Sequence, residues 1–145
     1  MVDVIYNELK KSLLNGDVDW DSDTIKGALV TSDYSPNQAN QDNFDDVTNE
    51  ITGTGYTAGG KNLSNKTVTT NNANQGVADA DDLSWSAATF TARGVVLYKD
   101  TGTPGTSKLI AYIDFGQDKE VDAGDFVVQW NASGILTLET KTDPL

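Results

Sequence analysis

From residue 24 onward the chain is a succession of short runs rich in β-branched and aromatic residues, separated by Gly, Asn, Asp and Pro. Such runs are typical of strands, and the residues between them are typical of turns. Helical periodicity disappears in this part of the chain, so we predict an all-β body. The predicted strands cover residues 24–31, 89–99, 108–115, 126–130 and 134–140, with a weaker strand at 66–70.

Run 89–99 shows the two-residue period of a strand most clearly. Residues of a regular strand point alternately to its two faces. One face then carries Phe90, Ala92, Gly94, Val96 and Tyr98, and the other carries Thr89, Thr91, Arg93, Val95 and Leu97. Both faces become apolar toward the C-terminal end of the run, which predicts a central strand there.

Turn residues predict how the strands connect. Gly102, Pro104 and Gly105 lie in segment 100–107, and segment 131–134 reads NASG, so tight antiparallel connections and a C-terminal meander of about four strands are expected. Between residues 33 and 88 large apolar residues are sparse, which predicts long loops or edge strands. The predicted fold class is mainly β, an antiparallel β-sandwich or jelly-roll-like barrel with two layers over one core. A chain of 145 residues is expected to form a single domain over 1–145.

The first sixteen residues are the exception, because their apolar residues recur at helical spacing. They predict a helix over residues 1–16 whose apolar stripe consists of Val2, Ile5, Leu9 and Leu13. Asp3 is the expected N-cap, and Gly16 is expected to end the helix in the left-handed conformation. So short a helix must pack against something. It either covers its own sheet or docks on a neighbouring subunit or partner.

The charge balance excludes several classes of function. Asp and Glu number 22 against 10 Lys and Arg, a net charge of −12, which opposes binding to nucleic acid or to an anionic membrane. The chain has no His and no Cys. It therefore lacks the usual zinc ligands, a thiol nucleophile and any histidine that could act as an acid or base in catalysis. Paired carboxylates hydrolyse glycosides in some enzymes, but nothing in the sequence positions such a pair. We therefore expect no enzymatic activity and assign no catalytic residue and no cofactor.

Two acidic runs resemble metal sites only superficially. An EF-hand calcium loop that began at Asp17 would need Gly and Glu where this chain has Ser22 and Ala28. A solvated acidic turn is therefore expected at residues 16–23, and no metal site is assigned. The second run is expected to accept backbone hydrogen bonds in a turn. The aspartates concerned are Asp17, Asp19, Asp21 and Asp23 in the first run, and Asp79, Asp81 and Asp82 in the second.

Segment 53–60 (GTGYTAGG) combines four glycines with one tyrosine. Glycine permits positive φ or close backbone approach, and Tyr56 offers a large apolar ring with a hydroxyl group. We expect this loop to be anchored on the sheet by Tyr56. The three tryptophans are widely spaced and are expected in the core, whereas an exposed pair would favour carbohydrate binding. They are Trp20, Trp85 and Trp130.

Four segments together resemble small virion-associated proteins of tailed bacteriophages. They are DWDSDTIKGALVTSDYSPN (19–37), FDDVTNEITGTGYTAGGKNLSNKTV (44–68), SWSAATFTARGVVLYKDTGTPGTSKLIAYIDFG (84–116) and FVVQWNASGILTLET (126–140). With the helix that precedes them, the resemblance covers nearly the whole chain. It implies a non-enzymatic component of the virion, and it names no ligand.

Among virion roles, we expect a capsid decoration or cement protein, because the chain is small, acidic, all-β and made in the host cytoplasm without a signal peptide. Its partners would be the major capsid protein or other virion proteins, and copies at symmetry-related positions would form a homo-oligomer. The alternative is a neck, tail or fibre component, including a receptor-binding module for a host glycan. The expected partner contacts, for which packing within the chain is the competing explanation, are Val2, Ile5, Leu9, Gly53, Gly55, Tyr56, Gly59 and Gly60.

Overall fold

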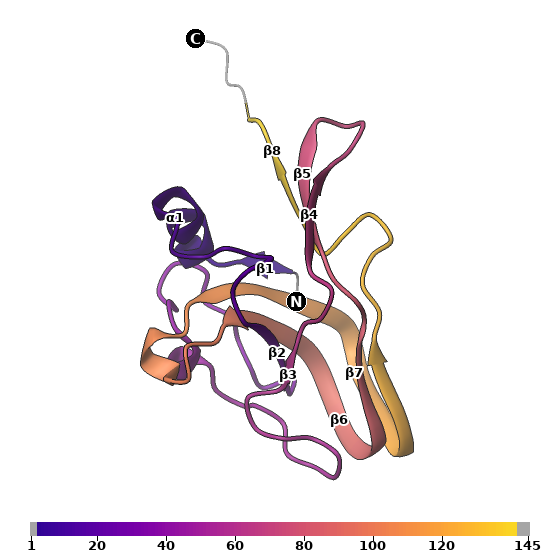
Figure 1. Cartoon of the computed structure of the whole chain (residues 1–145). Helices are drawn as coiled ribbons and strands as arrows, with labels where there is room; N and C mark the ends of the chain where they lie inside the picture. The colour runs from indigo at the N-terminus through magenta and orange to yellow at the C-terminus, as the bar shows by residue number, and fades with distance from the viewer. Residues whose placement is uncertain (1–2, 142–145) are drawn as a thin grey trace.

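Two antiparallel sheets dominate the structure, a computed structural model that describes residues 3–141 (Figure 1). The larger sheet has the strand order β1 (Val4–Ile5), β7 (Leu109–Val128), β6 (Leu83–Lys99), β2 (Ile25–Val30) and β3 (Lys61–Asn62). The smaller sheet has the order β4 (Thr67–Thr70), β5 (Gln75–Asp79) and β8 (Leu136–Glu139). The predicted fold class, mainly β with antiparallel sheets in a sandwich-like layout and one short N-terminal helix, is confirmed.

The N-terminal helix is shorter than the sequence predicts. Helix α1 spans Asn7–Asn15, and the residues before it form β1, in which Val4 pairs with Tyr112 of β7. Asp3 is not the N-cap, because its carboxylate accepts a hydrogen bond from the Asp114 backbone N–H at 2.9 Å. Gly16 ends the helix at φ 75°, as predicted. No helix in residues 3–141 is long and apolar enough to cross a bilayer.

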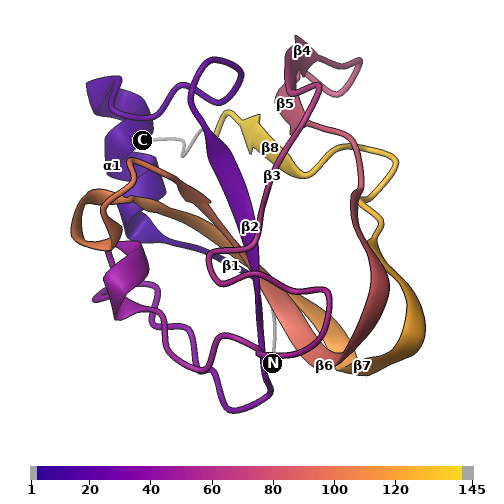
Figure 2. The same cartoon turned by 60° about the horizontal axis from the view of Figure 1, so that its bottom comes forward.

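The ribbon formed by β6 and β7 makes up most of the larger sheet and bends strongly along its length (Figures 1 and 2). Strand β7 joins the two predicted strands 108–115 and 126–130 into one, and β6 extends the predicted strand 89–99 back to Leu83. Because β6 lies between β7 and β2, the prediction of a central strand is confirmed. Two short 3₁₀ helices, η1 (Phe44–Asp46) and η2 (Pro104–Thr106), lie in the loops.

The predicted alternation along residues 89–99 is wrong beyond Arg93. A register shift between Ala92 and Gly94 interrupts the pairing of β6 with β7. A shift of one residue moves every following side chain to the other face of a sheet. Phe90 therefore joins the same buried cluster as Val95, although strict alternation would separate them.

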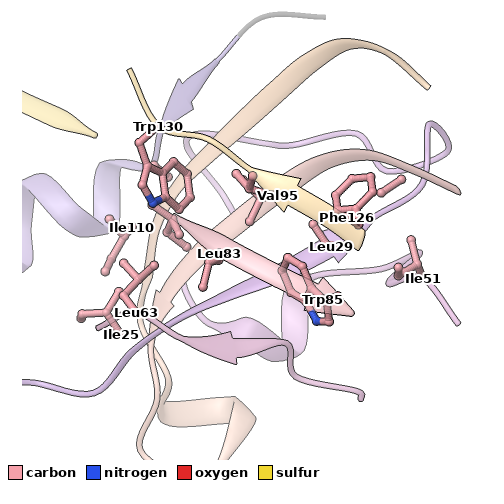
Figure 3. Close-up of a cluster of buried hydrophobic side chains, with 14 of the residues drawn as sticks. Ile25, Leu29, Ile51, Leu63, Leu83, Trp85, Val95, Ile110, Phe126 and Trp130 are labelled. Carbon is pink, nitrogen blue, oxygen red and sulfur yellow. The ribbon is translucent and has the colours of Figure 1, made fainter. Parts of the chain in front are cut away.

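Buried side chains form two clusters on opposite faces of the larger sheet, rather than the single core expected. On β2, Leu29 belongs to one cluster, while its neighbours Ala28 and Val30 belong to the other. The first, which we call the main cluster, is centred on Trp85 and includes the residues labelled in Figure 3. The second, which we call the tyrosine cluster, consists of Tyr6, Ala28, Val30, Tyr34, Val96, Tyr98, Leu109 and Tyr112.

The last strand does not belong to the predicted C-terminal meander. Segment 131–134 does form a turn, in which the Gly134 N–H donates to the Asn131 carbonyl at 2.9 Å. The strands on either side of this turn do not pair with each other, however, because β8 pairs with β5 in the smaller sheet. Region 33–88 is mostly loop, with edge strands β3 and β4 as expected, but it also contains β5, which the sequence did not predict.

Candidate interaction surface

The glycine-rich loop 53–60 packs on the larger sheet. A Cβ on Gly53 would lie 2.5 Å from the Thr89 carbonyl oxygen of β6. Gly60 has φ +78°, and a Cβ there would meet the Gly27 carbonyl and lie 2.8 Å from the Ala28 Cα of β2. Glycine is therefore required at both positions by close backbone approach.

Tyr56 anchors this loop, as predicted. Its hydroxyl donates to Glu50 Oε1 at 2.6 Å and accepts the backbone N–H of Leu29 at 3.0 Å. The same Glu50 oxygen accepts the Gly59 N–H at 2.6 Å. Burial and the hydrogen bond to Glu50 raise the pKa of Tyr56. These contacts lie within the chain, so a partner contact by loop 53–60 stays a prediction.

The helix face predicted to contact a partner is largely occupied by the chain itself. Leu9 is 5 % exposed and belongs to the main cluster, so most of its surface is covered by the chain itself. Ile5 is half-buried against the same cluster, and Val2 lies outside the described residues. The helix therefore covers its own sheet, the first of the two expected alternatives. Leu13 and Leu14 are exposed at its C-terminal end.

A buried carboxylate joins α1 to Lys108, the residue directly before β7. Glu8 has a side chain 3 % exposed and accepts hydrogen bonds from Lys108 at 2.5 Å and from Lys11 at 2.7 Å. Burial raises the pKa of Glu8, but the hydrogen bonds and charges of the two lysines outweigh it and hold the pKa below its ordinary value. The ion pair between Glu8 and Lys108 therefore helps to hold the helix against the sheet.

Three tyrosines meet in the tyrosine cluster on the other face of the sheet. The Tyr34 hydroxyl donates to Gln41 Oε1 at 2.9 Å, so Tyr6 is the donor in the 2.5 Å hydrogen bond between the Tyr6 and Tyr34 hydroxyls. Burial raises the pKa of Tyr6. Tyr112 packs edge-on against Tyr34. Its pKa is raised to about 12 by burial and by the charge of Asp114.

The first acidic run forms a turn, whereas the second lies at the end of β5 and in the segment that leads to β6. In the first, Asp23 Oδ2 accepts the Asp19 N–H at 2.8 Å and pairs with Lys99 at 3.0 Å. In the second, Asp82 Oδ1 accepts a backbone N–H at 3.1 Å, but the donor is Trp130, 48 residues away, so this hydrogen bond is a long-range contact and not the predicted local turn. Among residues 3–141, no group of three acids gathers in an arrangement that would hold a metal ion.

All three tryptophans are buried, as predicted. Trp20, Trp85 and Trp130 are 7 %, 1 % and 9 % exposed, and all belong to the main cluster. The indole N–H of Trp20 donates to the Asp79 carbonyl at 3.1 Å, and that of Trp130 donates to the Asp81 carbonyl at 2.9 Å. No two of them form an exposed stacking platform for a sugar ring.

An apolar cavity lies between α1 and the smaller sheet. We call this cavity of about 630 Å³ the helix–sheet groove. Leu9 and Leu13 line it from the helix, and Val18 and Trp20 line it from the segment that follows. Its third wall is the apolar face of the smaller sheet, formed by Val68, Gly76, Ala78, Leu136 and Leu138.

Three large apolar side chains at the groove are exposed to solvent. Leu13 is 42 % exposed, Val68 58 % and Leu138 69 %. Exposed apolar side chains that converge on one concave surface are typical of sites that bind another molecule. Sequence reasoning predicted Leu13 as part of an apolar stripe but missed the wall opposite, because β5 was not predicted and β8 was placed in the wrong sheet.

A second cavity, of about 700 Å³, lies toward β1 and β7. It is more polar, and its lining includes Asp3, Lys119 and Asp125 beside Phe115 and Trp130. Leu136 lines both cavities, so β8 lies between them.

No protein-family model, no curated protein and no solved structure shows a significant match to this chain.

Proposed function

We propose that this chain is a non-enzymatic structural protein of a bacteriophage virion, where it decorates the head and stabilises the shell of the major capsid protein. The observation that carries the proposal is the sequence resemblance described above, which extends over residues 19–37, 44–68, 84–116 and 126–140. Those segments supply β2, the anchored loop 53–60, most of the β6–β7 ribbon and β8.

The ionisable groups inside the fold support a structural role. Glu8 is bound by two lysines, Glu50 by Tyr56 and a backbone N–H, and Asp114 by Arg93 at 2.7 Å. Glu8 and Asp114 therefore join segments that are distant in sequence, and Glu50 holds loop 53–60 in place. A protein that must hold its shape on a pressurised shell needs such links.

The charge supports a position on the outside of the head. With a net charge of −12, the protein would be repelled by packaged DNA and would face solvent. Binding only to the expanded shell would stabilise that state by mass action. Contacts between neighbouring copies would add avidity without requiring a strong contact at any single site.

The test is binding of the purified protein to expanded capsids that lack it, with unexpanded capsids as the matched control. We expect saturable co-sedimentation with the expanded shells alone and a higher temperature of shell disruption. Absence of binding to expanded shells would overturn the decoration role. Binding at the neck or tail, seen by electron microscopy, would instead favour the alternative virion location.

A further inference from the structure

The helix–sheet groove borders an open sheet edge. Strand β8 is the last strand of the smaller sheet, and within the described residues only β5 pairs with it. Figures 1 and 2 both show β8 on the side of this sheet that is nearer to α1. The free edge of β8 is therefore on the helix side of the sheet, and residues 136–139 of this strand line the groove. An edge strand presents unpaired backbone N–H and C=O groups that can pair with another chain.

The sequence of β8 would let an added strand continue the apolar wall. Leu136 and Leu138 lie opposite Ala78 and Gly76 of β5 and line the groove from one face of the sheet. Thr137 and Glu139 alternate with them along β8 and also contribute to the lining. A strand paired with β8 would place every second side chain on the same face. Those side chains would enter the space between Leu138 and Leu13 of the helix.

The size of the surface favours a peptide segment over a second copy of this chain. Strand β8 has four residues, so its edge is about 13 Å long. Only three large exposed side chains surround the groove, whereas a stable dimer buries about 800 Å² on each partner. Two copies would also bring together two chains that each carry a net charge of −12.

The charged residues at the rim of the groove indicate which residues would flank the bound segment. Asp19 and Glu139 line the groove, and Lys10 is the one basic residue in its lining. Two negative charges against one positive charge favour lysine or arginine over acidic residues at the ends of the occupant.

We propose that the groove binds an extended segment of a partner protein, with alternating apolar residues and basic flanks, which adds as a fourth strand to β8. Main-chain hydrogen bonds would supply affinity, and the groove would select the alternating side chains. The inference goes beyond the proposed function, since such a groove would serve a partner inside or outside a virion.

The test uses the full chain and a fluorescent peptide, acetyl-Lys-Val-Thr-Val-Thr-Val-Lys-amide. A control peptide has glutamate in place of both lysines. We expect fluorescence anisotropy to show saturable binding of the basic peptide and weaker binding of the acidic one. Nuclear Overhauser effects between the peptide backbone and Thr137 are expected, because an added strand would lie beside β8. Absence of binding at millimolar peptide, or binding without these contacts, would overturn the inference.

Three variants distinguish peptide binding in the groove from nonspecific binding to the protein surface. Leu138→Asp and Leu13→Asp each place a charge in the groove and are expected to weaken peptide binding about tenfold or more. Leu14→Asp is the matched control, because Leu14 is 91 % exposed on the same helix and does not line the groove. It is expected to leave the affinity unchanged. An equal loss in all three variants would overturn the assignment.

Two further results distinguish this inference from others. Self-association in sedimentation velocity that Leu138→Asp abolishes would assign the groove to a second copy and overturn a partner segment. The peptide assay contains no capsids, so its outcome is independent of the decoration role. Capsid binding without peptide binding would refute the groove assignment alone, and peptide binding without capsid binding would refute decoration alone.

Discussion

Replacement of Gly60 by alanine should destabilise the fold much more than the same change at Gly102. Both glycines have a left-handed backbone, with φ +78° and +85°. A Cβ in that conformation costs about 1–2 kcal/mol at either position. At Gly60 it would also press on Gly27 and lie 2.8 Å from the Ala28 Cα, whereas at Gly102 it would meet nothing within 4 Å.

The difference between the two variants isolates the contact between loop 53–60 and β2. Backbone atoms of a central strand cannot rotate away, and overpacking typically adds about 1–3 kcal/mol. We therefore expect a loss of about 2–5 kcal/mol for Gly60→Ala and about 1–2 kcal/mol for Gly102→Ala. Urea denaturation followed by the fluorescence of the buried tryptophans measures both. Equal losses, or a larger loss at Gly102, would refute the close packing of this loop.

Ala87 and Ala123 have φ 48° and 50°, a conformation that strains a residue with a Cβ, so glycine at either position should raise the free energy of unfolding by about 0.5–1 kcal/mol. A lower free energy of unfolding in both glycine variants would contradict backbone strain at these alanines. Tyr6→Phe removes a buried donor and should cost about 1 kcal/mol in urea denaturation. Tyr112→Phe should be neutral, because no described residue hydrogen-bonds its buried hydroxyl; an equal cost would contradict this assignment. The pKa of Glu8 is lowered by folding, so its contribution to stability is complete above its unfolded pKa of about 4.3 and is lost as the pH falls through the folded pKa. Glu8→Gln should therefore lower stability at pH 7 and flatten the acid limb of a stability profile; parallel profiles would contradict the role of the ion pair.

Local signals in the sequence located most of the strands. Strand β2 lies within the predicted run 24–31, and β4 lies within 66–70. Gly16 ended the helix as expected, because the need for a left-handed residue at a helix end is itself local. The predicted start of the helix was wrong because Ile5 fits the helical stripe, yet it pairs with Ala111 of β7, beside Val4 in β1.

The interruption in β6 shows where periodicity fails. Strict alternation assigned Phe90 and Val95 to opposite faces, but the register shift near Gly94 unites them. The one available signal was the glycine itself, since glycine inside a strand often marks a bulge or a close approach. A Cβ on Gly94 would lie 2.5 Å from the Tyr112 ring, so the neighbour that requires glycine is distant in sequence.

The groove depended on pairings that no local pattern encodes. The tight turn at 131–134 suggested that the last two strands pair, whereas β8 crosses to β5. The choice between these partners rests on long-range packing, such as Val77 against Gly134. Leu13 lines the groove from the helix, and Leu138 lines it from the smaller sheet. Because the smaller sheet was not predicted, the sequence indicated the helix wall of the groove but not the sheet wall.

The number of copies per virion tests the proposed role most directly. Quantitative mass spectrometry of purified virions would measure this chain relative to the major capsid protein. Closed symmetry ties copy number to location, so decoration of the head predicts copies on the order of hundreds, in a fixed ratio to the shell protein. About a dozen to a few dozen copies would place the chain at the neck, tail or fibres and contradict decoration. Absence from the virion would contradict the structural role altogether.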